Sequence, residues 1–224
     1  MRKFPLHLIA ILIVAAASLR AEQPADKPVL LLTGFEPFGG LKVNASWETA
    51  KTFEGAEIGG YQIRTALLPV VYDEMEKPLL DAIQKNHPRI VISMGVGTKV
   101  VQVETIARNG YHPQKPPDNK GKPPPRAEIV VKAPKEIPTA LPADAIVAAL
   151  KKANIGAKSS TDAGGYLCNE CFYRLMNASV ELKARGFIHV PDFGTADPEG
   201  GTFDKEKLRK AIEIAIATTI QSVK

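Results

Sequence analysis

A cysteine and a histidine flank one predicted helix near the C-terminal end of the chain. Residues 164–168 and 186–191 are short apolar segments typical of β-strands, and residues 169–185 between them are typical of a helix. If the two strands are parallel, a helical crossover brings their carboxyl ends to one edge of a sheet, where open α/β sheets bind ligands. We therefore expect Cys168 and His189 to meet at that edge.

These two side chains suit nucleophilic chemistry. Cys168 would open the helix, where the helix dipole and unpaired backbone N–H groups favour a thiolate over a thiol. A histidine within hydrogen-bond reach can take the thiol proton and later give it to a leaving amine. The pattern predicts a cysteine hydrolase. The alternative is that Cys168 is a small buried hydrophobic residue and His189 a hydrogen-bonded residue at a strand end.

The rest of the chain alternates between strand-like and helix-like segments. Apolar runs indicate strands at residues 28–33, 61–71 and 89–94, and amphipathic patterns indicate helices at residues 46–53, 73–86, 143–153 and 203–222. Such alternation is typical of a three-layer α/β/α domain with a largely parallel, mixed central sheet. The chain has no internal repeat and no long linker, so residues 22–224 are predicted to form a single catalytic domain.

The N-terminal segment has the pattern of a secretory signal peptide. Two basic residues precede an apolar run over residues 6–17, and small residues follow it, so residues 1–21 are predicted to be removed on export to the periplasm or the medium. The segment holds three of the 29 basic residues and no acid, so without it the formal net charge falls from +5 to +2. This weak charge favours no nucleic-acid partner, and we expect no membrane contact after signal removal.

Residues 112–126 cannot form regular structure, because they include six prolines. Such a segment is either a solvated loop or a lid that helps to form a binding site. It contains His112, which is an alternative general base to His189. The four histidines of the chain show no metal-ligand spacing, so neither a metal ion nor a cofactor is expected; they are His7, His87, His112 and His189.

Several motifs resemble those of the type I pyroglutamyl peptidases, a family of cysteine peptidases. The sequence of residues 32–40 is LTGFEPFGG, and Asn44 and Ser46-Trp47 follow it, as in the N-terminal signature of that family. Cys168-Asn169 and the segment 186–191 resemble its cysteine and histidine signatures. These motifs occur in the family's order over nearly all of the chain after residue 21. The resemblance implies removal of N-terminal pyroglutamate from peptides.

The resemblance also implies the third catalytic group. Sequence spacing leaves several carboxylates open as the partner that orients the histidine, namely Asp162, Glu170, Asp192 and Asp197. The family places an acid before an Ala-x-Asn motif, and Glu104 precedes Ala107-Arg108-Asn109 in this way. A triad of Cys168, His189 and Glu104 is therefore implied, and so is a homo-oligomer, since family members often form dimers or tetramers.

The same resemblance implies which residues contact the substrate. The aromatic walls of the family's binding site correspond to Phe35 and Phe38, and Lys115 stands where many relatives have an arginine in the proline-rich loop. Bacterial relatives commonly have a Gln-Ala-Gly-Gly run after the third strand, whereas this chain has Met94-Gly95-Val96-Gly97. We therefore place Met94 at the substrate site, where the usual side-chain amide is missing.

Two other functions remain open at this point. Cys168 and Cys171 form a C-x-x-C motif at a helix start, which is typical of thiol–disulfide oxidoreductases, and a disulfide between them would block the nucleophile. The chain could also be an inactive or repurposed exported relative that only binds its ligand. The positions of Glu104 and His189 favour the peptidase, since redox exchange requires neither.

Overall fold

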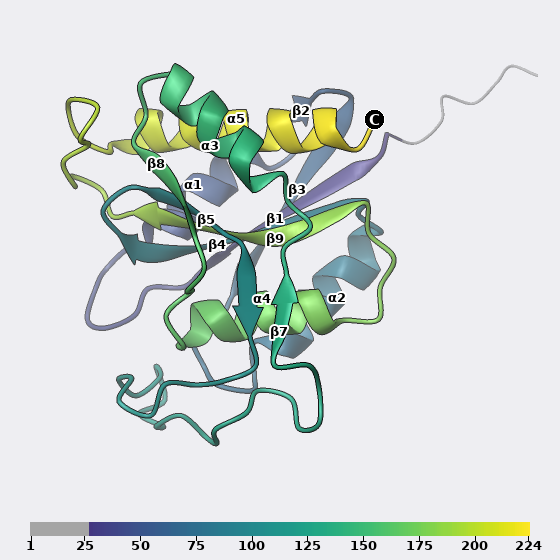
Figure 1. Ribbon diagram of the computed structural model, residues 1–224, viewed down its shortest axis with the longest axis vertical. Helices are drawn as coiled ribbons and strands as arrows, with labels where there is room; N and C mark the ends of the chain where they lie inside the picture. The colour runs from purple at the N-terminus through teal and green to yellow at the C-terminus, as the bar shows by residue number, and fades with distance from the viewer. Residues whose placement is uncertain (1–26) are drawn as a thin grey trace, which may run out of the picture.

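A seven-stranded sheet crosses the middle of the computed structural model, which describes residues 27–224 (Figure 1). The strand order is β2-β3-β1-β4-β9-β5-β8. The strands are β1 (Val29–Phe35), β2 (Glu57–Ile58), β3 (Tyr61–Leu68), β4 (Ile90–Thr98), β5 (Val101–Glu104), β8 (Ala157–Ser160) and β9 (Ala184–Pro191). A separate antiparallel pair is formed by β6 (Ile106–Arg108) and β7 (Glu136–Pro138).

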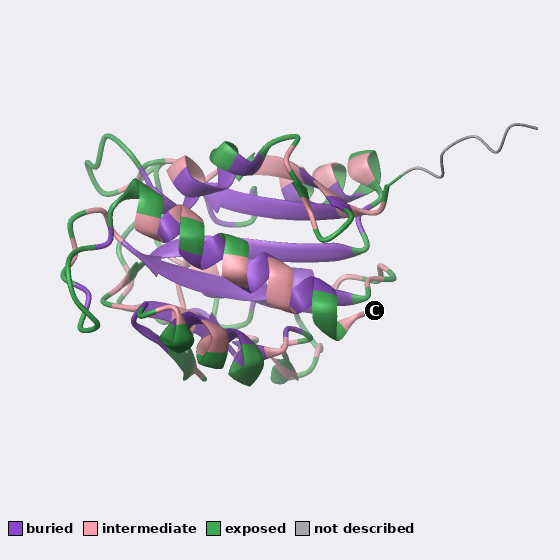
Figure 2. Ribbon diagram, turned by 90° about the horizontal axis from the view of Figure 1, so that it is seen from above, coloured by how far each residue is buried: buried purple, intermediate pink, exposed green. Residues whose placement is uncertain are grey.

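Helices cover both faces of the sheet, as the α/β/α prediction requires. One face is covered by α1 (Ala45–Ala50) with the short 3-10 helix η1 (Lys51–Phe53), α3 (Ala143–Lys152) and α5 (Lys205–Ser222), and the other by α2 (Glu76–Asn86) and α4 (Leu167–Asn177) (Figure 1). Helices α2, α3 and α5 turn a buried stripe toward the strands and an exposed side toward solvent, whereas α1 and α4 contain only buried and half-buried residues (Figure 2). Two hydrophobic clusters result, one on each side of the sheet.

The helix boundaries follow from local sequence signals. Asn44 caps α1, because its Oδ1 accepts a hydrogen bond from the backbone N–H of Ser46 at 3.0 Å. Asp204 caps α5 in the same way, accepting from the N–H of Lys207 at 2.7 Å. At the other end of α2, His87 adopts the left-handed conformation that commonly ends a helix, with φ of 44°.

The sheet is mixed, and this corrects the predicted strand–helix–strand unit. Strands β3, β1, β4 and β9 are parallel, whereas β5 pairs with β9 in the antiparallel sense and β8 pairs with β5 in parallel. Residues 164–166 form a turn instead of a strand, because Gly164 and Gly165 both have positive φ, at 84° and 62°. The strand before α4 is therefore β8, which is neither adjacent to β9 nor parallel to it.

The helix itself is shorter than predicted. It ends at Asn177 rather than near residue 185, and residues 178–183 connect it to β9. The predicted signal peptide, residues 1–21, lies outside the described residues. Within residues 27–224, none of the helices has both the length and the apolar character that crossing a bilayer requires.

Candidate active site

Cys168 and His189 lie together at one edge of the sheet, as the sequence predicts. Cys168 is in the first turn of α4, and His189 is near the carboxyl end of β9. Gly95 on β4 stands opposite His189 in the sheet register. A Cβ atom at position 95 would lie 2.5 Å from the sulfur of Cys168, so the thiol rests directly on the glycine backbone.

Glu104 orients the imidazole of His189. Oε1 of Glu104 lies 2.8 Å from Nδ1 of His189, and both side chains are buried. Burial lowers the pKa of His189, but the neighbouring Cys168 and Glu104 outweigh it and raise that pKa to about 10. Oε2 of Glu104 is buried without a hydrogen-bond partner in the described part of the chain. Because an unpaired buried charge is costly, the positive charge of the His189 imidazolium stabilises the buried Glu104 carboxylate.

Asn169 holds the start of α4 in place. Its Nδ2 donates to the carbonyl oxygens of Arg108 and Gly110, and its Oδ1 accepts from the backbone N–H of Arg108. The N-cap residue of α4, Tyr166, makes no capping hydrogen bond through its side chain. The backbone N–H groups of the first turn therefore face the site without a side-chain cap.

The other carboxylates that spacing had left open do not reach the imidazole. Glu170 accepts from Nε of Arg174 at 2.8 Å, and burial raises its pKa. Asp197 pairs with Lys207 and accepts from the backbone N–H of Gly156. Asp162 accepts from the N–H of Gly164, and Asp192 from that of Phe193. Glu104 is thus the carboxylate in contact with His189.

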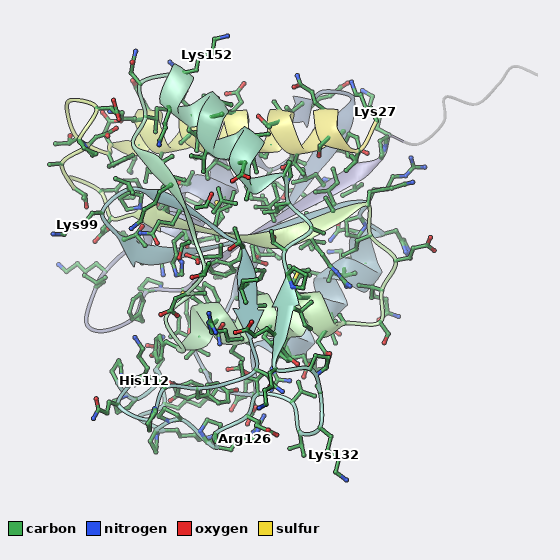
Figure 3. The ribbon with its side chains drawn as sticks, in the orientation of Figure 1. Lys27, Lys99, His112, Arg126, Lys132 and Lys152 are labelled. Carbon is green, nitrogen blue, oxygen red and sulfur yellow. The ribbon has the colours of Figure 1, made fainter. Side chains whose placement is uncertain are left out.

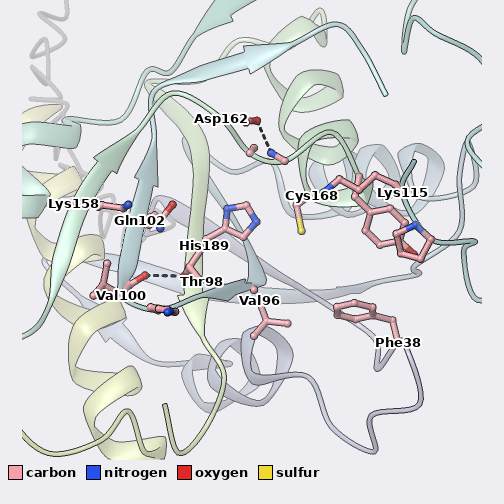
Figure 4. Close-up of a pocket in the computed structure, with 16 residues that line it drawn as sticks. Phe38, Val96, Thr98, Val100, Gln102, Lys115, Lys158, Asp162, Cys168 and His189 are labelled. Atoms are coloured by element: carbon pink, nitrogen blue, oxygen red, sulfur yellow. Dashed lines mark hydrogen bonds between the residues drawn. The ribbon is translucent and has the colours of Figure 1, made fainter. Parts of the chain in front are cut away.

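A cavity of about 770 Å³ opens beside Cys168 and His189 (Figure 4). Its lining divides into an apolar end at Phe38, Val96 and Tyr166 and a polar end that includes Gln102 and Lys158. Figure 4 shows His189 between these two ends. A smaller pocket adjoins the apolar end and is lined by Phe35, Phe38, Asn44, Val70, Val96, Tyr166, Leu167 and Cys168.

Phe35 and Phe38 both line this smaller pocket, but Met94 lines neither cavity. Met94 is fully buried in the cluster on the far side of the sheet, because side chains alternate along a strand and Gly95 is the residue that faces Cys168. The placement of Met94 at the substrate site is therefore corrected. Val96 lines both pockets instead, close to the point where the pairing of β4 with β9 shifts register.

The proline-rich segment 112–126 forms part of the cavity wall. Lys115 and Pro116 line the cavity, and the Tyr166 hydroxyl donates to the carbonyl oxygen of Pro117. Asn119 attaches the segment to the loop after β1, donating to the Glu36 carboxylate and to the carbonyl oxygen of Pro37. We call this segment the binding loop because it lines the cavity, although most of its residues are exposed to solvent.

His112 does not belong to the cavity lining. It is exposed on the loop region at the foot of the molecule, where Figure 3 labels it with Arg126. Its Nδ1 accepts from the backbone N–H of Gln114 at 3.3 Å. The alternative of His112 as the general base therefore has no support from its position.

Comparison with known proteins identifies the family. The family model described as pyroglutamyl peptidase matches residues 28–222. The pyrrolidone-carboxylate peptidase of Klebsiella pneumoniae is 38% identical over 199 residues, which cover 86% of this chain and 92% of that protein. That of Brevibacillus brevis is 35% identical, with coverage of 85% and 92%. The chain belongs to the pyroglutamyl peptidase family.

Solved structures of this family share the fold. Pyroglutamyl peptidase I from Bacillus amyloliquefaciens is 34% identical, with a TM-score of 0.79 and coverage of 87% of this chain and 95% of that one. A variant pyrrolidone carboxyl peptidase from Pyrococcus furiosus is 31% identical, also with a TM-score of 0.79, over 88% and 100% of the two chains. The protein is a cysteine-type peptidase with the family's α/β fold.

The family's nucleophile motif contains a second cysteine here, but the geometry does not favour redox exchange. Cys168 and Cys171 are both free thiols. Cys171 is completely buried, and burial raises the pKa of its thiol far above the ordinary range. A resolving cysteine must attack a disulfide as a thiolate, and Cys171 stays protonated and inaccessible.

Sequence reasoning missed four residues of this site. Tyr166 and Val96 line both pockets, Gly95 supports the sulfur, and Asn169 anchors the helix. Gly95 had a detectable signal, since a glycine within an apolar strand indicates close approach of another group. Asn169 had one too, since it belongs to the motif that resembles the family's cysteine signature, whereas Tyr166 and Val96 had none, because their contacts come from segments distant in sequence.

Proposed function

We propose that this protein removes an N-terminal pyroglutamyl residue from peptides through a thioacyl-enzyme formed on Cys168. The observation that carries the proposal is the sulfur of Cys168 resting on Gly95, beside the hydrogen-bonded pair of His189 and Glu104 and at the mouth of a small apolar pocket. Membership of the pyroglutamyl peptidase family supports the substrate class.

In the first half of the reaction, the Cys168 thiolate attacks the pyroglutamyl carbonyl carbon and forms a carbon–sulfur bond. The backbone N–H groups of the first turn of α4 donate to the oxyanion, and Lys115 from the binding loop adds a positive charge on the same cavity wall. The imidazolium of His189 then protonates the leaving amine as the carbon–nitrogen bond breaks.

In the second half, water replaces the amine. His189, now neutral, takes a proton from the water molecule that attacks the thioester. The carbon–sulfur bond then breaks, so pyroglutamate is released and the Cys168 thiolate and His189 imidazolium are restored. Glu104 keeps the imidazole in one orientation and stabilises its cation in both halves, so it acts as a positioning residue.

The small pocket suits the pyroglutamyl ring, which is flat and uncharged. Phe38 and Tyr166 stand with ring centroids 6.2 Å apart, and Phe35 and Val70 lie deeper in the pocket. Apart from the nucleophile Cys168 itself, no charged side chain within residues 27–224 lines this pocket. Val96 lines this pocket, and the glutamine that many relatives carry in the run corresponding to residues 94–97 is absent, so the lactam of the substrate is expected to pair with backbone groups.

The test uses residues 22–224 and the fluorogenic amide of pyroglutamate with 7-amino-4-methylcoumarin. We expect turnover by the wild-type protein, retained by Cys171→Ser and abolished by Cys168→Ala and His189→Ala with the fold intact. The matched control substrate is prolyl-aminomethylcoumarin, whose ammonium finds no carboxylate in the pocket and should be rejected by at least about 10²-fold. Turnover by Cys168→Ala, or equal turnover of the two substrates, would contradict the proposal.

The retained triad also argues against an inactive binding relative, because none of its three side chains is displaced from the site.

We further propose that the protein is exported through residues 1–21 and forms a homo-oligomer. The family match begins at residue 28, after this segment. N-terminal sequencing of the protein from cell fractions tests export, and light scattering tests the oligomer. An intact Met1 in the cytoplasmic fraction would contradict the first, and a monomer the second.

A further inference from the structure

Four side-chain positions form one row across the edge of the sheet that carries the site. The register pairs Gly95 of β4 with His189 of β9, His189 with Gln102 of β5, and Gln102 with Lys158 of β8. Residues paired on adjacent strands point to the same face of a sheet. The row therefore begins at Gly95 beneath the Cys168 sulfur, passes through the general acid His189 and ends at the exposed Lys158 (Figure 4).

This row sets the direction in which the leaving peptide lies, given the proposed function on which the inference rests. The acyl group occupies the apolar pocket on the side of Cys168 that carries Phe38 and Tyr166. The leaving amine must lie within reach of His189 to receive its proton. The peptide beyond the scissile bond consequently extends away from the apolar pocket, over Gln102 toward Lys158.

The charge at that end of the cavity is positive. Lys99 and Lys158 both line it, and both are exposed (Figures 3 and 4). Neither forms an ion pair with a carboxylate in residues 27–224. Asp162 is the acidic residue of the cavity lining, and it accepts a hydrogen bond from the backbone N–H of Gly164. The Glu104 carboxylate is buried against His189.

We propose that Lys158, with Lys99 in the same cavity lining, recognises a carboxylate on the leaving portion of the substrate. Adjacent strands are about 4.8 Å apart, so Lys158 lies roughly 10 Å beyond His189, and an extended peptide advances about 3.3 Å per residue. The carboxylate is therefore carried by the second or third residue after the scissile bond. It belongs either to an aspartate or glutamate side chain or to the free C-terminus of a short peptide.

A competition experiment tests this directly. Pyroglutamyl-Ala-Glu-Ala-amide and pyroglutamyl-Ala-Gln-Ala-amide are mixed in equal amounts, and mass spectrometry of their products gives the ratio of kcat/KM. A second pair, pyroglutamyl-Ala-Ala with a free carboxylate and with an amide, tests the C-terminal source. We expect the charged member of at least one pair to be favoured about two- to fivefold, the range for an exposed ion pair, and the preference to shrink in 0.5 M NaCl.

The variants separate the lysine's charge from general effects on the protein. Lys158→Gln should abolish the preference, Lys158→Arg should keep it, and Lys151→Gln, at an exposed position on α3 outside the cavity lining, should leave it unchanged. Turnover of the uncharged coumarin amide reports the basal activity of each variant. A ratio near one for both pairs, or a preference that survives Lys158→Gln, would overturn this inference alone. Absence of turnover with the coumarin amide would overturn the proposed function as well.

Discussion

Gly95 leaves the space on β4 that the sulfur of Cys168 occupies, and an alanine there would remove that space. The added Cβ would lie 2.5 Å from the sulfur, whereas ordinary contact begins at 3.4 Å, so the shortfall is about 0.9 Å. The sulfur is the end of a side chain and can move by rotation about χ1. The Gly95→Ala protein is therefore expected to fold with Cys168 turned away from His189.

The effect on activity is expected to exceed the effect on stability. A displacement of about 1 Å in a reacting atom can cost about 10²-fold in rate, which is about 2.7 kcal/mol in the activation free energy. The new Cβ also meets the ring tip of Phe187 at 2.9 Å, and overpacking of this kind costs about 1–3 kcal/mol of folding free energy. Domains usually have 5–15 kcal/mol of stability, so the variant should remain folded.

The assay compares kcat/KM for the coumarin amide, the rate of Cys168 alkylation by iodoacetamide and the melting temperature. Gly186→Ala is the control, because its Cβ would clash with Thr139 and Leu141 but not with Cys168. The control should lose stability and keep its activity per folded molecule, whereas Gly95→Ala should lose activity. A folded Gly95→Ala enzyme with kcat/KM near that of the wild type would refute the reasoning.

Three further predictions concern the buried pair of His189 and Glu104 and the second cysteine. The raised pKa of His189 means that the folded protein keeps the imidazolium above pH 6.5. The charged His189 therefore makes its full contribution to the free energy of unfolding below pH 6.5, and this contribution is lost as the pH rises through about 10. Activity falls over the same range, because His189 loses the proton that it gives to the leaving amine. Glu104→Gln should lower kcat/KM by about 10²-fold and move this alkaline limb to lower pH, and an unmoved limb would show that Glu104 does not set the charge of His189. Cys171→Ser should keep turnover near the wild-type value while costing about 1–3 kcal/mol in urea unfolding, and activity lost from folded Cys171→Ser protein would assign Cys171 a direct role.

The meeting of Cys168 and His189 could be predicted from sequence, but not for the reason first expected. Cys168 lies in the first turn of a helix and His189 near the end of the strand that follows it, as expected. Because this helix and strand run in opposite directions, the start of the helix meets the end of the strand. The expected parallel strand before the helix is absent. Of the two apolar residues that suggested this strand, Tyr166 lines the cavity and Leu167 is the first residue of the helix.

The short strands could not be predicted, because their sequences carry little hydrophobic pattern. Strand β8 has the sequence AKSS, of which only Ala157 is buried, so its extended conformation depends on its pairing with β5. Strands β6 and β7 have three residues each. The position of Glu104 required the family resemblance for the same reason, since β5 is four residues long and its register alone places the carboxylate beside His189.

The register of the sheet also separates the residues that the chemistry requires in a fixed position from those that are proposed to select substrates. A slip of one residue in β5 would turn Gln102 and Glu104 to the opposite face and leave His189 without its carboxylate, so the pairing of β5 with β9 tolerates no shift. Lys158 lies on the edge strand β8 and Lys115 in an irregular loop, where a change of side chain disturbs neither the core nor the triad. Substitution of Lys158 should therefore change which peptides are preferred without changing the rate for an uncharged leaving group. Lys115 is proposed to act on the oxyanion instead, so turnover of the coumarin amide should fall after Lys115→Gln but not after Lys158→Gln. Equal effects of the two substitutions on that turnover would contradict this division of roles.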